Sequence, residues 1–214
     1  RALLALKDAD VATARRYYAE ALASHPNKLS LLERAMRLDL MAGDVQAAEA
    51  LARRALEVDV GHALSNYVIG SVRLADRELD LAEVALRQSM KRARFPEALN
   101  DLAWLLFLKR EYAESESLAR EAVELRPGVC HAWDTLGATL LAQGELEEAE
   151  EALQKALSLA SNVGTLLHMA QLQAAKGDKE HAREIILMIA DKTGRLSSEA
   201  KADYDRLRRD LGDS

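Results

Sequence analysis

The stretch CHAWDTLGATLLAQGELEEAEEALQKALSLASN, residues 130–162, has the pattern of two helices joined by a tight turn. Leu136 and Leu140 recur at helical spacing, and leucine and alanine resume that spacing after Gly144. A glycine at this point ends the first helix readily, because it takes a positive φ without steric cost. The stretch therefore predicts a helix, a turn and an antiparallel second helix.

One position in this stretch recurs along the chain as a small side chain. We expect Gly137 and Ala149 to mark the closest approach of the two helices, because only small side chains let two backbones come near. The position of Ala149 is repeated along the chain by small residues at intervals of 34, 34, 33, 34 and 33 residues. These are Ala14, Ala48, Ala82, Ser115, Ala149 and Ala182. This fixed period indicates stacked copies of one supersecondary unit that share a functional surface.

The composition favours an all-α chain. Of its 214 residues, 49% are hydrophobic and only 4% aromatic, and runs of good helix formers recur. No segment alternates as a strand would. The longest apolar stretches, 103–108 and 185–190, are far shorter than the roughly 18 residues that a membrane-spanning helix needs. We therefore expect no membrane insertion within this chain.

Charge and motif content argue against nucleic-acid binding and catalysis. The formal net charge is −6, whereas a nucleic-acid-binding surface needs an excess of basic residues. The sequence has no GxxxxGK phosphate loop, GxSxG elbow or HExxH pair, and its single Cys130 excludes an internal disulfide. Metal-ligand spacing is missing among the histidines, which are His25, His62, His131, His168 and His181. We expect no enzyme activity, no metal and no cofactor.

The repeating pattern resembles the tetratricopeptide repeat, whose 34-residue signature combines Trp, Leu-Gly, Tyr, Gly, Ala, Phe, Ala and Pro. Residues 130–162 meet it best, with Trp133, Leu136 and Gly137 in phase. The resemblance implies a right-handed superhelical solenoid of about six antiparallel helix pairs within one domain. The expected units are a truncated first repeat at 1–28, repeats at 29–62, 63–95, 96–129, 130–162 and 163–195, and a C-terminal capping helix at 196–214.

Both ends of the array depart from a complete unit. Residues 11–26 match only the back half of a repeat, so residues 1–7 are expected to be the remainder of its first helix. We interpret the chain as a piece of a longer protein that begins inside a repeat. At the other end, Tyr204, Leu207 and Leu211 form the apolar stripe of one amphipathic helix, whose polar face would shield the last repeat from water.

The resemblance implies that a partner binds on the concave face, which the first helix of each unit lines. Tyr67, Trp104 and Phe107 are expected on adjacent first helices, and half-exposed aromatic residues often anchor partners. The alternative is that Trp104 and Phe107 pack between helices, as Trp133 is expected to do. The predicted partner-binding groove comprises Arg37, Tyr67, Asn100, Trp104, Phe107, His131, Asp134 and His168.

Two specialised grooves of this family are not matched. A clamp for a terminal carboxylate would need more basic residues than Arg34 and Arg37, and Asp134 interrupts it. A ladder of asparagines would need the same residue in successive units, and Asn66 with Asn100 is too short a run.

These observations predict a non-catalytic scaffold or adaptor that binds a peptide segment of a protein partner. The stretches NDLAW at 100–104 and WDTLG at 133–137 are similar to bacterial tetratricopeptide proteins of the cell envelope, including those of polysaccharide export and pilus assembly. This similarity implies either the bacterial cytoplasm or the periplasm. Two alternatives stay open: a regulatory arm of a larger enzyme whose catalytic domain lies outside this chain, and a homo-oligomer that self-associates through exposed stripes.

Overall fold

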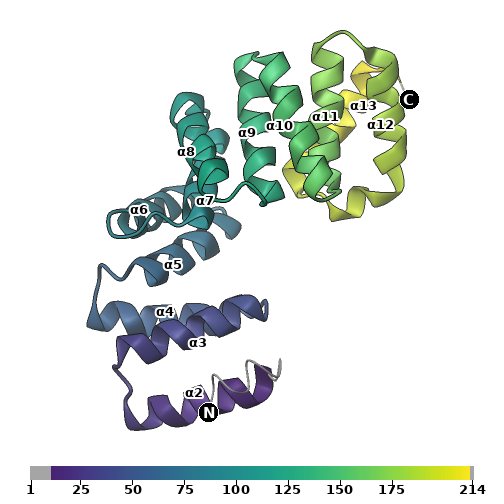
Figure 1. Ribbon diagram of the computed structural model, residues 1–214. Helices are drawn as coiled ribbons and strands as arrows, with labels where there is room; N and C mark the ends of the chain where they lie inside the picture. Colours follow the sequence, from purple (N-terminus) through teal and green to yellow (C-terminus); the bar gives the residue numbers. More distant parts are fainter. Residues whose placement is uncertain (1–10, 213–214) are drawn as a thin grey trace. The chain divides into compact units, whose positions relative to one another are not determined.

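A computed structural model describes residues 11–212 of the chain and is drawn in Figure 1. These residues contain helices and no strand, so the all-α expectation is confirmed. The expected helix remnant at residues 1–7 lies outside the described residues. The elements are α2 (Val11–Ser24), α3 (Leu29–Met41), α4 (Val45–Val58), α5 (Ala63–Ala75), α6 (Leu79–Met90), α7 (Pro96–Leu108), α8 (Tyr112–Leu125), α9 (Cys130–Gln143), α10 (Leu146–Leu159), α11 (Val163–Ala175), α12 (Lys179–Ile189), the 3-10 helix η1 (Ala190–Arg195) and α13 (Ser198–Asp210).

The chain divides into two compact units, and the boundary falls inside α7. Unit 1 is Arg1–Leu105 and contains α2 to α6 with most of α7. Unit 2 is Leu106–Ser214 and contains the end of α7 with α8 to α13. No turn or linker in the sequence marks this boundary, because a continuous helix crosses it.

Consecutive helices pack on one another within each unit. In unit 1, α3 pairs with α4 and α5 pairs with α6, while α4 also packs on α5. In unit 2, α9 pairs with α10 and α11 pairs with α12, while α10 also packs on α11. Asp44 and Asp178 cap second helices of these pairs by accepting hydrogen bonds from Ala47 N and His181 N. Each pair is a helical hairpin that stacks on its neighbour, as in solenoids.

The recurring small residues lie where the hairpins close. All six have no solvent exposure: Ala14, Ala48, Ala82, Ser115, Ala149 and Ala182. A Cβ atom added at Gly137 would lie 2.6 Å from Leu153 Cγ, and one added at Gly70 would lie 2.6 Å from Leu86 Cγ. The close contact of Gly137 is thus with Leu153, one helical turn beyond the expected Ala149. At these crossings the backbone of the first helix meets the side of a leucine.

The turns inside the hairpins place one residue in the left-handed region. Gly43, Gly144 and Gly177 take φ values of 74°, 86° and 88° there, as the sequence predicts for Gly144. Arg77 and Arg110 hold the same conformation with φ of 65° in the turns before α6 and α8. A side chain in this conformation costs roughly 1–2 kcal/mol, which the packing of the flanking helices must offset.

The helix α13 packs on α11 and α12, at the end of the array where a capping helix is expected. Ser197 begins it by accepting a hydrogen bond from Ala200 N at 3.2 Å. Tyr204 and Leu211 are buried, with exposed fractions of 5% and 2%. Arg183 of α12 donates from Nε to the carbonyl oxygen of Leu211 at 2.8 Å. The apolar stripe of the sequence is therefore the surface by which α13 covers the last hairpin.

Candidate functional site

The predicted groove residues lie on the first helices of the hairpins. We call the surface of α3, α5 and most of α7 in unit 1, and of the end of α7, α9 and α11 in unit 2, the first-helix face of each unit. Unit 1 contributes Arg37, Tyr67, Asn100 and Trp104, and unit 2 contributes Phe107, His131, Asp134 and His168. Arg37 and His131 are exposed, and the other six residues are half-buried. The first-helix face thus exposes the guanidinium of Arg37 in unit 1 and the imidazole of His131 in unit 2, each with half-buried predicted groove residues on the same face.

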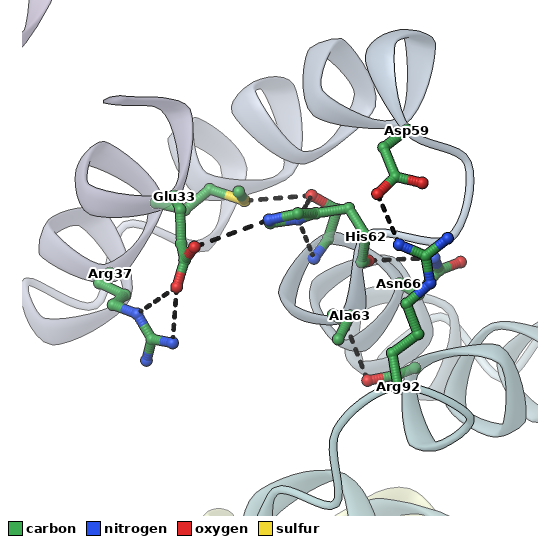
Figure 2. Close-up of polar contacts among 10 residues, drawn as sticks. Glu33, Arg37, Asp59, His62, Ala63, Asn66 and Arg92 are labelled. Atoms are coloured by element: carbon green, nitrogen blue, oxygen red, sulfur yellow. Dashed lines mark hydrogen bonds and ion pairs between the residues drawn. The ribbon is translucent and has the colours of Figure 1, made fainter. Parts of the chain in front are cut away.

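A polar cluster joins α3 to the start of α5 on the first-helix face of unit 1 (Figure 2). Arg37 Nη2 lies 2.9 Å from Glu33 Oε1, one turn earlier on α3. The other carboxylate oxygen of Glu33 lies 3.7 Å from His62 Nε2, and His62 Nδ1 lies 2.8 Å from Ser65 Oγ. Glu33 thus neutralises part of the charge of Arg37 and orients the imidazole before α5. Sequence reasoning missed the role of His62, because its partner Glu33 comes from another helix.

A second cluster in Figure 2 holds the loop between α4 and α5. Arg92 Nη1 lies 2.8 Å from Asp59 Oδ2. Asn66 Nδ2 donates to the carbonyl oxygens of Val60 and His62 at 2.9 and 3.1 Å. The amide of Asn66 therefore holds the loop that leads into α5.

Tyr67 is held in a packed and acidic environment on α5. Its ring meets the Phe95 ring edge-on, with centroids 6.3 Å apart. Burial, followed by the negative charge of Asp101, raises the pKa of Tyr67 to about 12, although a hydrogen bond with Ser71 opposes the shift. Ser71 Oγ donates in turn to Asp101 Oδ2. Tyr67 therefore stays uncharged at neutral pH and presents a phenol that is partly committed to packing.

The remaining aromatic residues differ in their surroundings. The Phe107 ring lies 5.8 Å from the Tyr112 ring at the start of α8, which favours the packing alternative for this residue. Trp133 Nε1 donates to the carbonyl oxygen of Pro127 at 2.8 Å, so this indole fixes the loop before α9. Trp104 is half-buried. Asn100 has a buried Oδ1 for which the described residues supply no hydrogen-bond donor.

Asp134 and His168, both predicted groove residues, contact each other directly. Asp134 Oδ1 on α9 lies 2.9 Å from His168 Nδ1 on α11, and their side chains are only 17% and 15% exposed. Burial lowers the pKa of His168, but the charge and hydrogen bond of Asp134, with the charge of Asp203, outweigh it and raise the pKa overall. This pair links two successive hairpins of unit 2.

A cavity of about 580 Å³ lies among α2, α3 and α4, away from the predicted groove residues. Alanines line much of it, including Ala19 and Ala50. At its polar end Arg15 binds Asp39 at 2.7 Å and Asp44 at 2.9 Å. The size is within the range of binding pockets. Sequence reasoning did not predict this cavity, because it arises from the spacing of three helices.

Replacing Arg15 with alanine is expected to lower the free energy of unfolding by about 1–3 kcal/mol, since the carboxylate of Asp39 loses its cation in a buried position. Burial raises the pKa of Asp39 and Arg15 opposes this, so the variant raises that pKa further. When the pKa of Asp39 is raised in the folded state, folding is favoured while the carboxyl is protonated. That contribution to the free energy of unfolding is lost as the pH rises through the folded pKa. The deficit should therefore be smaller at pH 4 than at pH 7 in urea unfolding.

The matched control is Arg16→Ala, which removes a neighbouring guanidinium. The side chain of Arg16 is 65% exposed, and its Nε lies as far as 4.0 Å from the carboxylate of Glu20. We expect its free energy of unfolding to change by less than about 0.5 kcal/mol. Equal losses in the two variants would show that Asp39 does not depend on Arg15.

Two further findings concern residues 11–212. Among them no group of three or more His, Cys, Asp and Glu side chains is arranged to hold a metal ion. In the same part of the chain no helix is long and apolar enough to cross a membrane.

Comparison with known proteins identifies the repeats. Residues 97–126 and 130–163 each match a family model described as tetratricopeptide repeat. PilF of Pseudomonas aeruginosa matches with a TM-score of 0.70 and 14% identity over 98% of this chain and 94% of that chain. PilW, a type IV pilus biogenesis factor, matches with a TM-score of 0.67 and 16% identity over 94% of each chain. YrrB, a TPR protein with an unusual peptide-binding site, matches with a TM-score of 0.63 and 17% identity over 88% of this chain and 97% of that chain.

A search of curated proteins by sequence found no match. The packing of consecutive hairpins defines the chain as an α-solenoid protein. Within this solenoid, residues 97–126 and 130–163 match tetratricopeptide-repeat models, in agreement with the period read from the sequence.

Proposed function

We propose that this chain is a non-catalytic scaffold that binds a peptide segment of a protein partner on its first-helix faces. The observation that supports it best is the array of half-buried and exposed side chains on these helices, from Arg37 and Tyr67 in unit 1 to His131 in unit 2. Repeats of this kind serve as interaction modules that stack to make extended binding surfaces. The peptide-binding site of YrrB, which has a similar fold, supports the same function.

We further propose a role in assembly at a bacterial cell envelope. PilF and PilW have a similar fold over nearly the full length of this chain, and PilW is a type IV pilus biogenesis factor. The stretches at 100–104 and 133–137, which are similar to bacterial tetratricopeptide proteins of the cell envelope, support this role. Copurification with envelope proteins from the source cell is the first test, and an exclusive association with a catalytic subunit would favour the regulatory-arm alternative.

The experiment that tests partner binding replaces Trp104 and Phe107 with alanine. Loss of a half-buried aromatic anchor in an interface weakens binding by about 30-fold or more, equivalent to about 2 kcal/mol. We expect that loss in a titration with the copurified partner, while the helical circular-dichroism signal persists.

The control variant is Trp133→Ala, because this indole is bound to the loop carbonyl of Pro127. It should leave the dissociation constant within about threefold of the unmodified chain. Loss of helical signal in the Trp104 and Phe107 variant would assign those side chains to packing. Unchanged affinity with an intact fold would exclude them from the binding surface.

A further inference from the structure

The cavity among α2, α3 and α4 lies where two long side chains of the repeat are replaced by alanine. In unit 2, Arg120 of α8 donates from Nη2 to Glu148 of α10 at 2.5 Å and so bridges two successive second helices. Three repeat periods earlier, the same positions are Ala19 on α2 and Ala47 on α4, and both line the cavity. The groove that a salt bridge spans in unit 2 is therefore left uncovered in unit 1.

The arginine of this bridge recurs in other second helices. It binds a glutamate four residues earlier in the pairs Glu49–Arg53, Glu83–Arg87 and Glu116–Arg120. The corresponding pair in α2 is Arg15 and Ala19. Arg15 binds Asp39 and Asp44 at the polar end of the cavity, and Ala19 adds only a methyl group to the lining. The uncovered groove thus results from a departure of α2 from the repeat.

The lining combines apolar side chains with one basic group that has donors to spare. Tyr18, Leu22 and Leu38 are buried, with exposed fractions of 5%, 6% and 2%. Arg54 of α4 also lines the cavity, and it donates to a neutral acceptor, the carbonyl oxygen of Pro26, at 3.1 Å. Among residues 11–212 no carboxylate pairs with Arg54. Since a guanidinium has five N–H donors, Arg54 can bind an anion in the cavity.

We propose that this cavity binds a small amphiphile, an apolar chain that ends in a carboxylate, with the carboxylate on Arg54. The apolar lining removes the chain from water, and the guanidinium forms charge-assisted hydrogen bonds with the carboxylate. The volume of about 580 Å³ is typical of sites for small molecules. None of the eight predicted groove residues lines the cavity, so this site is independent of the proposed function.

Two other occupants fit the cavity less well. A helix is about 10 Å across and needs about 400 Å³ for each turn, so the cavity would hold little more than one turn. An extended peptide brings backbone N–H and C=O groups that need partners when they are buried. The lining residues lie almost entirely within α2, α3 and α4, whose backbone groups bond to one another. An apolar chain needs no hydrogen bonds along its length and therefore suits this lining.

Sodium decanoate, titrated below its micelle concentration, is the probe that tests the site in the unmodified chain. We expect saturable binding with chemical-shift changes at the alanine methyl groups of the cavity and none at Ala152 of α10. The reporting methyl groups belong to Ala19, Ala23, Ala35, Ala47 and Ala50. No saturable binding, or equal shifts at Ala152, would overturn the proposal.

A double variant, Ala19→Arg with Ala47→Glu, gives unit 1 the pair that bridges α8 and α10 in unit 2. These side chains fill the groove, so decanoate should bind at least about tenfold more weakly while the helical circular-dichroism signal persists. The matched control, Ala12→Arg with Gln46→Glu, places the same side chains at exposed positions of α2 and α4 outside the lining. It should keep the dissociation constant within about threefold of the unmodified chain.

The substitution Arg54→Gln tests the charge separately and stays informative if the double variant fails to fold. Glutamine is the residue found one period later, at Gln88. Decanoate should bind about tenfold or more weakly to this variant, because a hydrogen bond to a charged group is lost, whereas decanol should bind equally to both chains. Equal decanoate affinity in Arg54→Gln and the unmodified chain would overturn the proposal. Decanol binding as tightly as decanoate would indicate an uncharged occupant and would also overturn it.

Discussion

Gly137→Ala is expected to lower the free energy of unfolding by about 1–3 kcal/mol, because the added methyl group overpacks the helix crossing. A Cβ at this position would lie 2.6 Å from Leu153 Cγ and 3.2 Å from the backbone nitrogen of Leu153. The side chain of Leu153 can move only by disturbing a core in which it is fully buried, and the backbone cannot move without shifting α10. Urea unfolding followed by circular dichroism measures the loss.

A double-mutant cycle separates this clash from a simple change in helix propensity. Leu153→Ala alone should cost about 2–5 kcal/mol through the cavity that it leaves. In that background Gly137→Ala should cost little, since the obstructing methyl groups are gone. Gly128→Ala is the control at a loop glycine where a Cβ would meet no atom within 4 Å. Additive losses in the cycle would refute the proposed contact.

Ending the chain at Leu196 is expected to produce the second large effect, because it removes α13 and uncovers α11 and α12. Burial of a large apolar side chain is worth about 1.5–3 kcal/mol, and α13 buries both Tyr204 and Leu211. We therefore expect a lower melting temperature and lower solubility than for the intact chain. Thermal unfolding and the concentration at which the protein precipitates measure the two effects.

Single substitutions in the intact chain show whether this loss comes from the apolar contacts of α13. Tyr204→Ala and Leu211→Ala should each reproduce part of the drop, whereas Arg208→Ala on the exposed side of the helix should not. An unchanged melting temperature after truncation would show that α13 is not a cap.

The helical hairpins were predictable because their signals are local. The small residues at the six positions equivalent to Ala149 recur at nearly constant spacing, and Gly144 ends a helix by a conformation that glycine favours. Sequence spacing did not predict the division inside α7, since nothing local marks it. The contact of Gly137 with Leu153 rather than Ala149 depends on how two helices slide along each other, which a single helix does not encode.

The candidate site was predictable as a set of helical positions but not as a set of contacts. Asp134 and His168 were both assigned to the groove from their register, yet their hydrogen bond depends on the stacking of α9 and α11. The salt bridges of Arg15 with Asp39 and Asp44 join α2 to α3 and to the residue that caps α4, over 24 and 29 positions. Such pairs carry no motif in a single sequence, so only a three-dimensional arrangement reveals them.

Site-specific photo-crosslinking tests the central claim most directly. A benzophenone amino acid is placed at Arg37 or His131 on the first-helix faces, and at Arg53 or Leu187 on second helices, all four being exposed positions. Arg53 is a close match for Arg37, because each pairs with a glutamate four residues earlier and they are 55% and 52% exposed. We predict partner adducts at Arg37 and His131 that map to one segment of the partner. Adducts at both Arg53 and Leu187, with none at Arg37 or His131, would contradict partner binding on the first-helix faces.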